Sequence, residues 1–349
     1  MAVSPKIRVA VNGYGVIGKR VADAVAQQKD MSLAGVADIS VDWRPRMATR
    51  KGFRLFGATG GSTDAMREAG MTPAGTLEDL LGEADIVVDC TPKRVAAKNV
   101  EIYRQLGRKF ILQGGEKHEA TGHSFVAESS YSSAIGREST RVVSCNTTSI
   151  VRTLTALKNA GLLRRARGTL LRRATDPWES HQGGIMNTLV PEDEIPSHQG
   201  PDAKSVDPEL DVITMAVKVP ETLAHLHYWS VQMTRPASKD EVLDAFRSSS
   251  RIALIRMKDG LEALNVVKEL MADIGRPHDN LYEVALWADM LRVEGDELFY
   301  AYMVDNQAIV IPETIDAIRA LDGNEPDASA SINATNAALG IGLAELYDA

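Results

Sequence analysis

Apolar and polar positions in the first third of the chain follow a repeating order that predicts strands separated by helices. Short apolar runs end beside glycine or polar residues, and stretches with apolar residues three or four apart lie between them, as at 17–25 and 96–106. The expected strands are 7–11, 33–38, 84–90, 109–113 and 140–145. This alternation predicts an α/β fold with a doubly wound parallel sheet of the Rossmann type.

The pattern changes in the second half of the chain, where longer extended segments appear. Strands are expected at 211–219, 223–233 and 297–304, and helices at 148–160, 239–246 and 261–274. They predict an α+β domain with a mixed, largely antiparallel sheet and helices packed on one face. Terminal helices at 312–320 and 328–339 are expected to dock on the first domain. We therefore predict a dinucleotide-binding domain at 1–144, completed by 305–349, and a catalytic and oligomerisation domain at 145–304.

Composition narrows the class of protein. A chain of 349 residues is too long for one ordinary core, and 44% hydrophobic with 25% charged residues is typical of a soluble globular protein. With 39 Lys and Arg against 47 Asp and Glu and no long basic run, neither a nucleic-acid nor a membrane partner is expected. The two cysteines form no disulfide framework and the first residues show no export signal, so we expect a cytoplasmic protein with free thiols.

A glycine-rich turn follows the first expected strand and precedes a helix. It fits the pattern G-x-G-x-x-G, with Gly13 for the tight turn, Gly15 for close approach of a pyrophosphate and Gly18 for helix packing. The helix also begins here, so Val16 and Ile17 are expected to contribute to the cofactor site through its amides and dipole. The alternative is a glycine turn without a ligand.

Asp38 ends the second expected strand, 20 positions after Gly18. A carboxylate there accepts hydrogen bonds from the adenosine ribose diol and repels a 2′-phosphate, which favours NAD over NADP. Arg44 and Arg46 follow closely, so NADP stays possible. Alternatively, Asp38 only begins a turn.

Cys145 is expected at the junction between a strand and a helix. Helix N-terminal amides stabilise a thiolate and an oxyanion, which makes Cys145 a candidate nucleophile and Ser144, Asn146 and Thr147 candidate substrate-binding residues. A lone cysteine is otherwise a small core residue, and the residues alone leave both readings open.

Several segments together resemble archaeal-type (type II) phosphorylating glyceraldehyde-3-phosphate dehydrogenase. They are GYGVIGKRVADAV, TPKRVAAKN, QGGEK, VVSCNTTSIVRTLTAL, LLRRATDP, PSHQGPD, HLH and IPETIDAIRA, in the family's order almost from end to end. The resemblance implies a two-domain subunit, usually in a homotetramer. It also implies conversion of glyceraldehyde 3-phosphate, inorganic phosphate and NAD(P) to 1,3-bisphosphoglycerate, a reaction of glycolysis and gluconeogenesis.

The resemblance also assigns the catalytic pair. The Cys145 thiolate attacks the aldehyde, and phosphate later cleaves the resulting thioester. By position in the family's HxH pattern, His225 handles the hydroxyl proton, and its imidazolium would lower the pKa of the thiol. His227 points to the same face of a strand and is the nearest rival, and His181 ranks third. No metal-ligand spacing links the histidines, so no metal is expected.

Further anion and cofactor contacts are implied by the same resemblance. Arg172 and Arg173 suit the cofactor or an anion, unless both are solvated edge residues. His198 and Gln199 occupy the substrate-phosphate segment, where the family more often has two histidines. The remaining expected cofactor contacts are Gly114, Gly115 and Gln307, whereas Cys90 is interpreted as a packing residue.

Two other functions compete with this reading. Another Cys/His semialdehyde dehydrogenase acting on phosphorylated substrates would share the fold. A noncatalytic NAD-sensing protein would bind the dinucleotide without chemistry. The thiol, the HxH strand and the anion-binding segments favour the enzyme.

Overall fold

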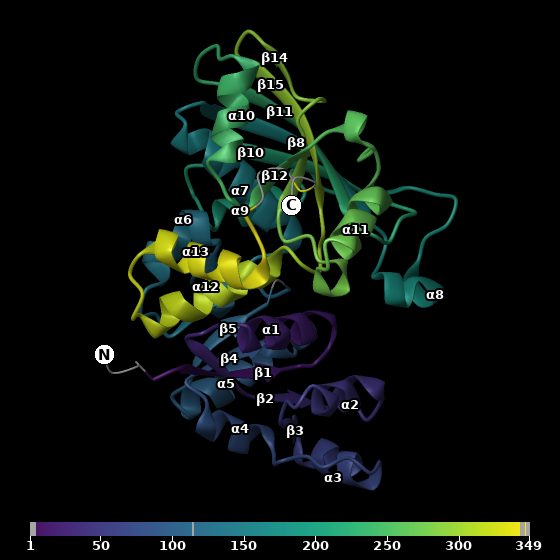
Figure 1. Ribbon diagram of the computed structural model, residues 1–349, viewed down its shortest axis with the longest axis vertical. Coiled ribbons are helices and arrows are strands. Elements are labelled where there is room, and N and C mark those ends of the chain that lie inside the picture. The colour runs from purple at the N-terminus through teal and green to yellow at the C-terminus, as the bar shows by residue number, and fades with distance from the viewer. Residues whose placement is uncertain (1–4, 114, 343–345, 347–349) are drawn as a thin grey trace. The chain divides into compact units, whose positions relative to one another are not determined.

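The computed structural model describes residues 5–113, 115–342 and 346, and the chain divides into two compact units (Figure 1). The first unit contains residues 1–143 and 311–339, and the second contains 144–310 and 340–349. The chain thus returns to the first unit at Ile311, six residues later than the expected 305, and leaves it again at Gly340. Leu346 belongs to the second unit because its side chain is fully buried in that unit's core.

The first unit is built on a seven-stranded sheet in which all neighbouring strands are parallel. Its strand order is β3-β2-β1-β4-β5-β7-β6, which confirms the predicted Rossmann sheet. The order reverses between β1 and β4, where doubly wound folds bind their ligands. The strands are β1 Ile7–Asn12, β2 Met31–Asp38, β3 Leu55–Gly57, β4 Ile86–Asp89, β5 Lys109–Leu112, β6 Ser124–Phe125 and β7 Ser139–Val142.

Helices α12 and α13 are fixed in the first unit by a buried guanidinium. Arg319 on α12 is 4% exposed and donates to Asp30 Oδ2 at 2.7 Å, Gln28 Oε1 at 2.8 Å and Thr335 Oγ1 at 2.6 Å. These bonds join α12 to α13 and to the segment before β2. The helices of this unit are α1 Val16–Ala26, α2 Trp43–Arg50, α3 Gly60–Glu68, α4 Leu77–Glu83, α5 Ala96–Gln105, α6 Ala127–Ala134, α12 Val310–Asp322 and α13 Ala328–Leu339.

The second unit contains a mixed sheet in the order β12-β13-β15-β11-β8-β10-β9, with β14 paired to β15. Among the described strands of this second sheet, only the β12–β13 and β8–β10 pairs are parallel, which confirms the predicted mixed, largely antiparallel sheet. The strands are β8 Leu163–Arg173, β9 Val190–Pro191, β10 Val212–Val219, β11 His225–Met233, β12 Ile252–Ile255, β13 Val284–Trp287, β14 Arg292–Glu294 and β15 Glu297–Val304.

Helices cover both faces of this sheet, so the prediction of helices on one face is wrong. Tyr302 and Tyr300 of β15 face α7 and α10, through Ser149 and Phe246. The alternate residues Ala301 and Met303 join the buried cluster that contains α11. Strands that are apolar on both faces need cover on both. The helices are α7 Cys145–Asn159, α8 Ser180–Gly183, α9 Gln199–Lys204, α10 Lys239–Arg247 and α11 Leu264–Asp273 (Figure 1).

Candidate active site

The glycine turn after β1 has the shape required to receive a dinucleotide. Gly13 has φ +93°, and a Cβ there would lie 2.9 Å from the Cys90 carbonyl carbon. A Cβ on Gly18 would lie 1.8 Å from Gly13 O, whereas one on Gly15 would meet nothing within 4 Å. Gly15 caps α1 without a side-chain hydrogen bond, so the first-turn amides of Val16 and Ile17 suit an anion. The residues fit a bound pyrophosphate.

Asp38 is held at the end of β2 by the backbone. Its Oδ2 accepts from Tyr14 N at 2.6 Å and its Oδ1 from Ser40 N at 2.7 Å. Both arginines expected to help a 2′-phosphate have protein partners: Arg44 binds Asp42 at 2.5 Å and Arg46 donates to Ala69 O at 2.8 Å. A carboxylate fixed in this way suits hydrogen bonds from a ribose diol.

A buried polar network connects the ends of β1 and β4, and sequence reasoning missed it. The Asp89 side chain is fully buried and accepts from Thr91 N at 2.9 Å, Asn99 Nδ2 at 2.8 Å and Tyr103 OH at 2.6 Å. Tyr103 OH in turn accepts from Asn12 Nδ2 at 2.8 Å. The network fixes the turn after β4 against which Gly13 packs. Residues so far apart in the chain leave no local signal of this kind.

Cys145 is the first residue of α7, three residues earlier than the predicted start of this helix. β7 ends at Val142, so the predicted strand 140–145 is too long. The cause is the N-cap Ser144, whose Oγ accepts from Thr147 N at 3.3 Å. Thr147 Oγ1 also donates to Asp202 Oδ2 on α9 at 2.7 Å, which ties the first turn of α7 to α9.

Burial dominates the electrostatics of the thiol. It raises the pKa of Cys145 from 9.0 to about 11, against the opposing effects of Arg173, the Asn146 backbone amide and Arg172. Burial also lowers the pKa of His225 well below 6.5, with smaller contributions from His227, Arg173 and Arg172. Both groups are therefore neutral at pH 7 without ligands, and the expected lowering of the thiol pKa by an imidazolium is absent in this state.

The two histidines of β11 have different environments, although both point to the same buried face as predicted. Arg173 N donates to His225 Nδ1 at 3.0 Å, so the neutral ring of His225 carries its proton on Nε2. His227 uses both nitrogens, with Nε2 at 2.8 Å from Asn146 Oδ1 and Nδ1 at 2.9 Å from Tyr302 OH. Through these two bonds, His227 on β11 links α7 to β15. His181 lies on the exposed helix α8.

Arg172 and Arg173 end β8, and their positive charges lower the pKa of both Cys145 and His225. Arg172 pairs with Glu192 and its Nε is buried without a hydrogen-bond partner. Arg173 binds Asp176 and donates to Thr222 O at 3.2 Å. Their side chains are 22% and 9% exposed, so they are not solvated edge residues.

The expected phosphate segment contains one exposed and one buried residue. The His198 side chain is 63% exposed, and its Nδ1 lies 3.3 Å from Glu192 Oε2. Gln199 is fully buried, and neither its Oε1 nor its Nε2 has a hydrogen-bond partner. A buried amide with both polar atoms unsatisfied is unfavourable unless a ligand or water completes it.

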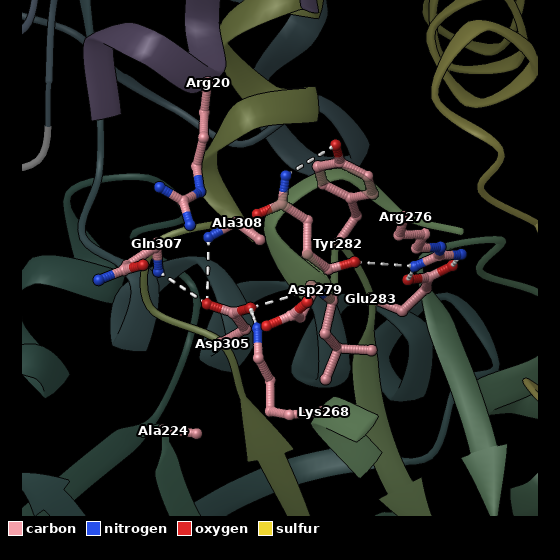
Figure 2. Close-up of polar contacts among 12 residues, drawn as sticks. Arg20, Ala224, Lys268, Arg276, Asp279, Tyr282, Glu283, Asp305, Gln307 and Ala308 are labelled. Carbon is pink, nitrogen blue, oxygen red and sulfur yellow. Dashed lines mark hydrogen bonds and ion pairs between the residues drawn. The ribbon is translucent and has the colours of Figure 1, made fainter. Parts of the chain in front are cut away.

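Gln307 lies on a turn organised by Asp305, as Figure 2 shows. Asp305 Oδ1 accepts from Gln307 N at 3.0 Å and Ala308 N at 3.3 Å, while Oδ2 binds Lys268 Nζ at 2.6 Å. Gln307 Nε2 donates to Asp176 Oδ1 at 2.8 Å, which connects this turn to Arg173. Sequence reasoning did not identify Asp176 or Asp305.

Gly115 and Cys90 lie in the first unit. Gly114 is outside the described residues. A Cβ on Gly115 would lie 3.3 Å from Lys93 Cβ, so Lys93 would have to shift slightly to accept a side chain there. Cys90 lies against the glycine turn, 3.4 Å from the Cβ position of Gly18, and burial raises the pKa of its thiol well above 9.0. Among the described residues, no group of three or more His, Cys, Asp and Glu is arranged to hold a metal ion.

A Rossmann sheet with its glycine turn, joined to a second unit bearing a helix-capping cysteine and a strand histidine, defines a nucleotide-binding oxidoreductase. The profile of the family described as "Glyceraldehyde 3-phosphate dehydrogenase, C-terminal domain" matches residues 144–274. That of "Dihydrodipicolinate reductase, N-terminus" matches residues 7–122.

Similar proteins span nearly the whole chain. Glyceraldehyde-3-phosphate dehydrogenase of Methanothermus fervidus is 42% identical over 95% of this chain and 98% of its own length. That of Methanobrevibacter smithii is 44% identical over 95% and 99%. The crystal structure of aspartate semialdehyde dehydrogenase II from Vibrio cholerae aligns over 91% of this chain and 99% of its own, with a TM-score of 0.64 and 14% identity, which shows a shared fold. The chain belongs to the glyceraldehyde-3-phosphate dehydrogenase family.

Proposed function

We propose that the protein oxidises D-glyceraldehyde 3-phosphate to 1,3-bisphosphoglycerate with NAD(P) and inorganic phosphate, in glycolysis or gluconeogenesis. The observation that carries the proposal is the position of Cys145. It is the first residue of α7, and the positive charges of Arg172 and Arg173 both favour its thiolate form. The charges of the same arginines lower the pKa of His225, and the Arg173 backbone N–H fixes its ring by donating to Nδ1. A thiol, an imidazole and two cations in one strand-end cluster suit acyl transfer to phosphate.

The first step adds sulfur to the aldehyde carbon. Cys145 loses its thiol proton to solvent, and the carbonyl π electrons move to oxygen as the C–S bond forms. The Asn146 amide and the helix dipole stabilise the negative charge, while the Ser144 cap holds the Thr147 amide. His225 Nε2–H, set by the Arg173 backbone bond, is a donor suited to the same oxygen. In this tautomer the ring serves as an oxyanion donor rather than the expected base.

The second step converts the hemithioacetal to a thioester and then to an acyl phosphate. A bound nicotinamide dinucleotide would supply the hydride acceptor and a positive charge. As the oxyanion collapses, the C=O bond re-forms and the C–H bond breaks with its electron pair, which that acceptor would take, and an acyl thioester is left on Cys145. A phosphate oxygen then attacks this carbonyl, the C–S bond breaks, and the thiolate leaves.

Arg172, His198 and Gln199 are proposed to form the phosphate-binding part of the site. Arg172 has a buried Nε without a partner, and Gln199 has an unsatisfied buried amide. These donors suit phosphate oxygens. Because Gln199 is uncharged, the cationic contribution comes from Arg172.

NAD is the proposed dinucleotide, with NADP a weaker alternative. The support is the carboxylate of Asp38, held at the end of β2 by Tyr14 N and Ser40 N, and the commitment of Arg44 to Asp42. Gln307, Arg173 and Gly115 are proposed to lie on the nicotinamide side. Measuring KM for both dinucleotides tests this preference.

We also propose a homotetramer. Apolar side chains on one face of the second sheet are exposed at Met215 (42%), Tyr228 (44%) and Phe299 (37%), and they line one shallow hollow. A contiguous apolar surface of this kind is typical of a subunit interface. Tyr228→Glu should lower the mass measured by light scattering, and an unchanged mass would contradict this interface.

A reducing compartment such as the cytoplasm is proposed as the site of action, because Cys145 must stay a thiol to react. No described helix is long and apolar enough to cross a membrane.

Turnover monitored at the NADH absorbance, with and without inorganic phosphate, tests the proposed function. Steady-state oxidation of glyceraldehyde 3-phosphate that requires phosphate supports it. Activity confined to aspartate semialdehyde or its relatives would favour the alternative enzyme. Dinucleotide binding without any turnover would favour a sensor.

A further inference from the structure

A carboxylate occupies the anion-binding side of Arg172. Glu192 Oε1 pairs with Arg172 Nη1, and Glu192 Oε2 lies 3.3 Å from His198 Nδ1. The carboxylate therefore bridges two of the residues proposed to bind phosphate. Its side chain is 19% exposed, so it is neither freely solvated nor part of the core.

The backbone fixes this carboxylate in place. Glu192 directly follows β9, whose Val190 and Pro191 pair with β10, and Glu192 N donates to Ala216 O at 2.9 Å. The Glu192 side chain thus projects from an extension of β9 that is hydrogen-bonded to β10. β10 pairs in turn with β8, the strand that carries Arg172 near its end. It is not a mobile surface charge that meets the arginine by chance.

Other buried polar atoms of the site have no protein hydrogen-bond partner. Arg172 Nε and both amide atoms of Gln199 are buried without a partner, although Arg172 Nη1 is paired. A phosphate oxyanion is tetrahedral and offers several acceptor oxygens, whereas one carboxylate offers two. Glu192 therefore balances the positive charge of Arg172, but buried polar atoms of Arg172 and Gln199 are left without hydrogen bonds.

We propose that Glu192 is a built-in competitor that lowers the affinity of this site for phosphate oxyanions and that moves away from Arg172 when the anion binds. This inference rests on the proposed phosphate site. Two like charges cannot share one guanidinium without repulsion, so each phosphate must displace the carboxylate. The ligand is either inorganic phosphate or the phosphate group of the aldehyde substrate, which share this chemistry.

Glu192→Gln tests the competition with little change in shape. Because glutamine removes the charge, KM should fall about tenfold for whichever phosphate uses Arg172. A fall in KM for inorganic phosphate or for glyceraldehyde 3-phosphate identifies which anion lies there. Glu194→Gln, two residues away and exposed, is the matched charge control and should leave both KM values unchanged.

A binding measurement separates this inference from the reaction itself. Protection of Cys145 from iodoacetamide is titrated with inorganic phosphate and, separately, with glycerol 3-phosphate, in wild type, Glu192→Gln and Glu192→Gln/Arg172→Gln. The inference predicts tighter protection by one anion in the single variant and loss of that gain in the double variant. Unchanged or weaker protection by both anions in Glu192→Gln overturns it, because the carboxylate would then organise Arg172 rather than compete. Absence of phosphate-dependent turnover in wild type would instead overturn the proposed function alone.

Discussion

At the residue scale, the reactivity of the thiol depends on its surroundings more than on its position in a motif. Burial raises the pKa of Cys145 to about 11, above the ordinary 9.0. The thiolate fraction of the ligand-free enzyme should therefore keep rising through pH 9. Iodoacetamide labelling of the Cys145 peptide at pH 6–10 measures this, with Cys90 resolved by mass. A plateau near pH 7 would show an ion-paired thiolate and contradict the assignment.

The two β11 histidines should respond differently to substitution. His225→Asn removes the Nε2–H donor and should lower kcat by about 10²- to 10⁴-fold. His227→Asn should lower kcat less, and stability should fall by about 1–3 kcal/mol because the buried Asn146 Oδ1 is left unpaired, while Tyr302 OH keeps its bond to Ser149.

Steady-state kinetics and thermal unfolding of both variants measure these effects. His227→Gln, whose longer amide can donate to Asn146, is the matched variant that should recover part of the lost stability. A larger kcat loss at His227 than at His225 would reverse the assignment.

At the element scale, the glycine turn separates binding from folding. In Gly15→Ala the new methyl group enters open space, so the unfolding temperature should hold while dinucleotide affinity falls. In Gly18→Ala the methyl group would lie 1.8 Å from Gly13 O, so α1 must shift and the unfolding temperature should fall as well. Calorimetry and fluorescence titration distinguish the two variants, and equal unfolding temperatures would refute the contrast.

The apolar pattern predicted the ends of some elements. The strand ending at Asp38 and the helix spanning Ala328–Leu339 have the expected ends. The sequence pattern predicted no bounds for β8, because arginines interrupt its apolar pattern, as in Arg164, Arg165 and Arg167. Pairing with β10 and β11 on either side stabilises it nevertheless.

The site was predictable as far as local motifs reach. Cys145 and the histidine pair stand in recognisable segments, whereas Glu192 and Asp176 meet the arginines only through the tertiary fold. The pKa of Cys145 was expected to fall because burial of the thiol is not visible in the sequence.

At the scale of the whole molecule, buried neutral histidines should make the protein sensitive to acid. Burial lowers the pKa of His123 to about 4, that of His227 to about 3 and that of His225 well below 6.5. Between pH 6.5 and 4 the unfolded chain binds protons there that the folded chain does not, so stability falls as pH falls.

The slope contributed by three such groups approaches about 4 kcal/mol per pH unit. Thermal unfolding from pH 7 to pH 5 should show a steep decrease in midpoint temperature. His123→Gln, which removes one of these groups outside the proposed site, should flatten the dependence. A midpoint independent of pH over this range would contradict the neutral state of these rings.

In the proposed reaction, Cys145 carries the acyl group as a thioester that phosphate cleaves. Mass spectrometry of the Cys145 peptide after a single turnover with glyceraldehyde 3-phosphate and NAD, without phosphate, tests it most directly. An acyl adduct is expected on Cys145, which disappears when phosphate is added and which the Cys145→Ser variant never forms. Turnover without such an adduct, or an adduct on another residue, would contradict it.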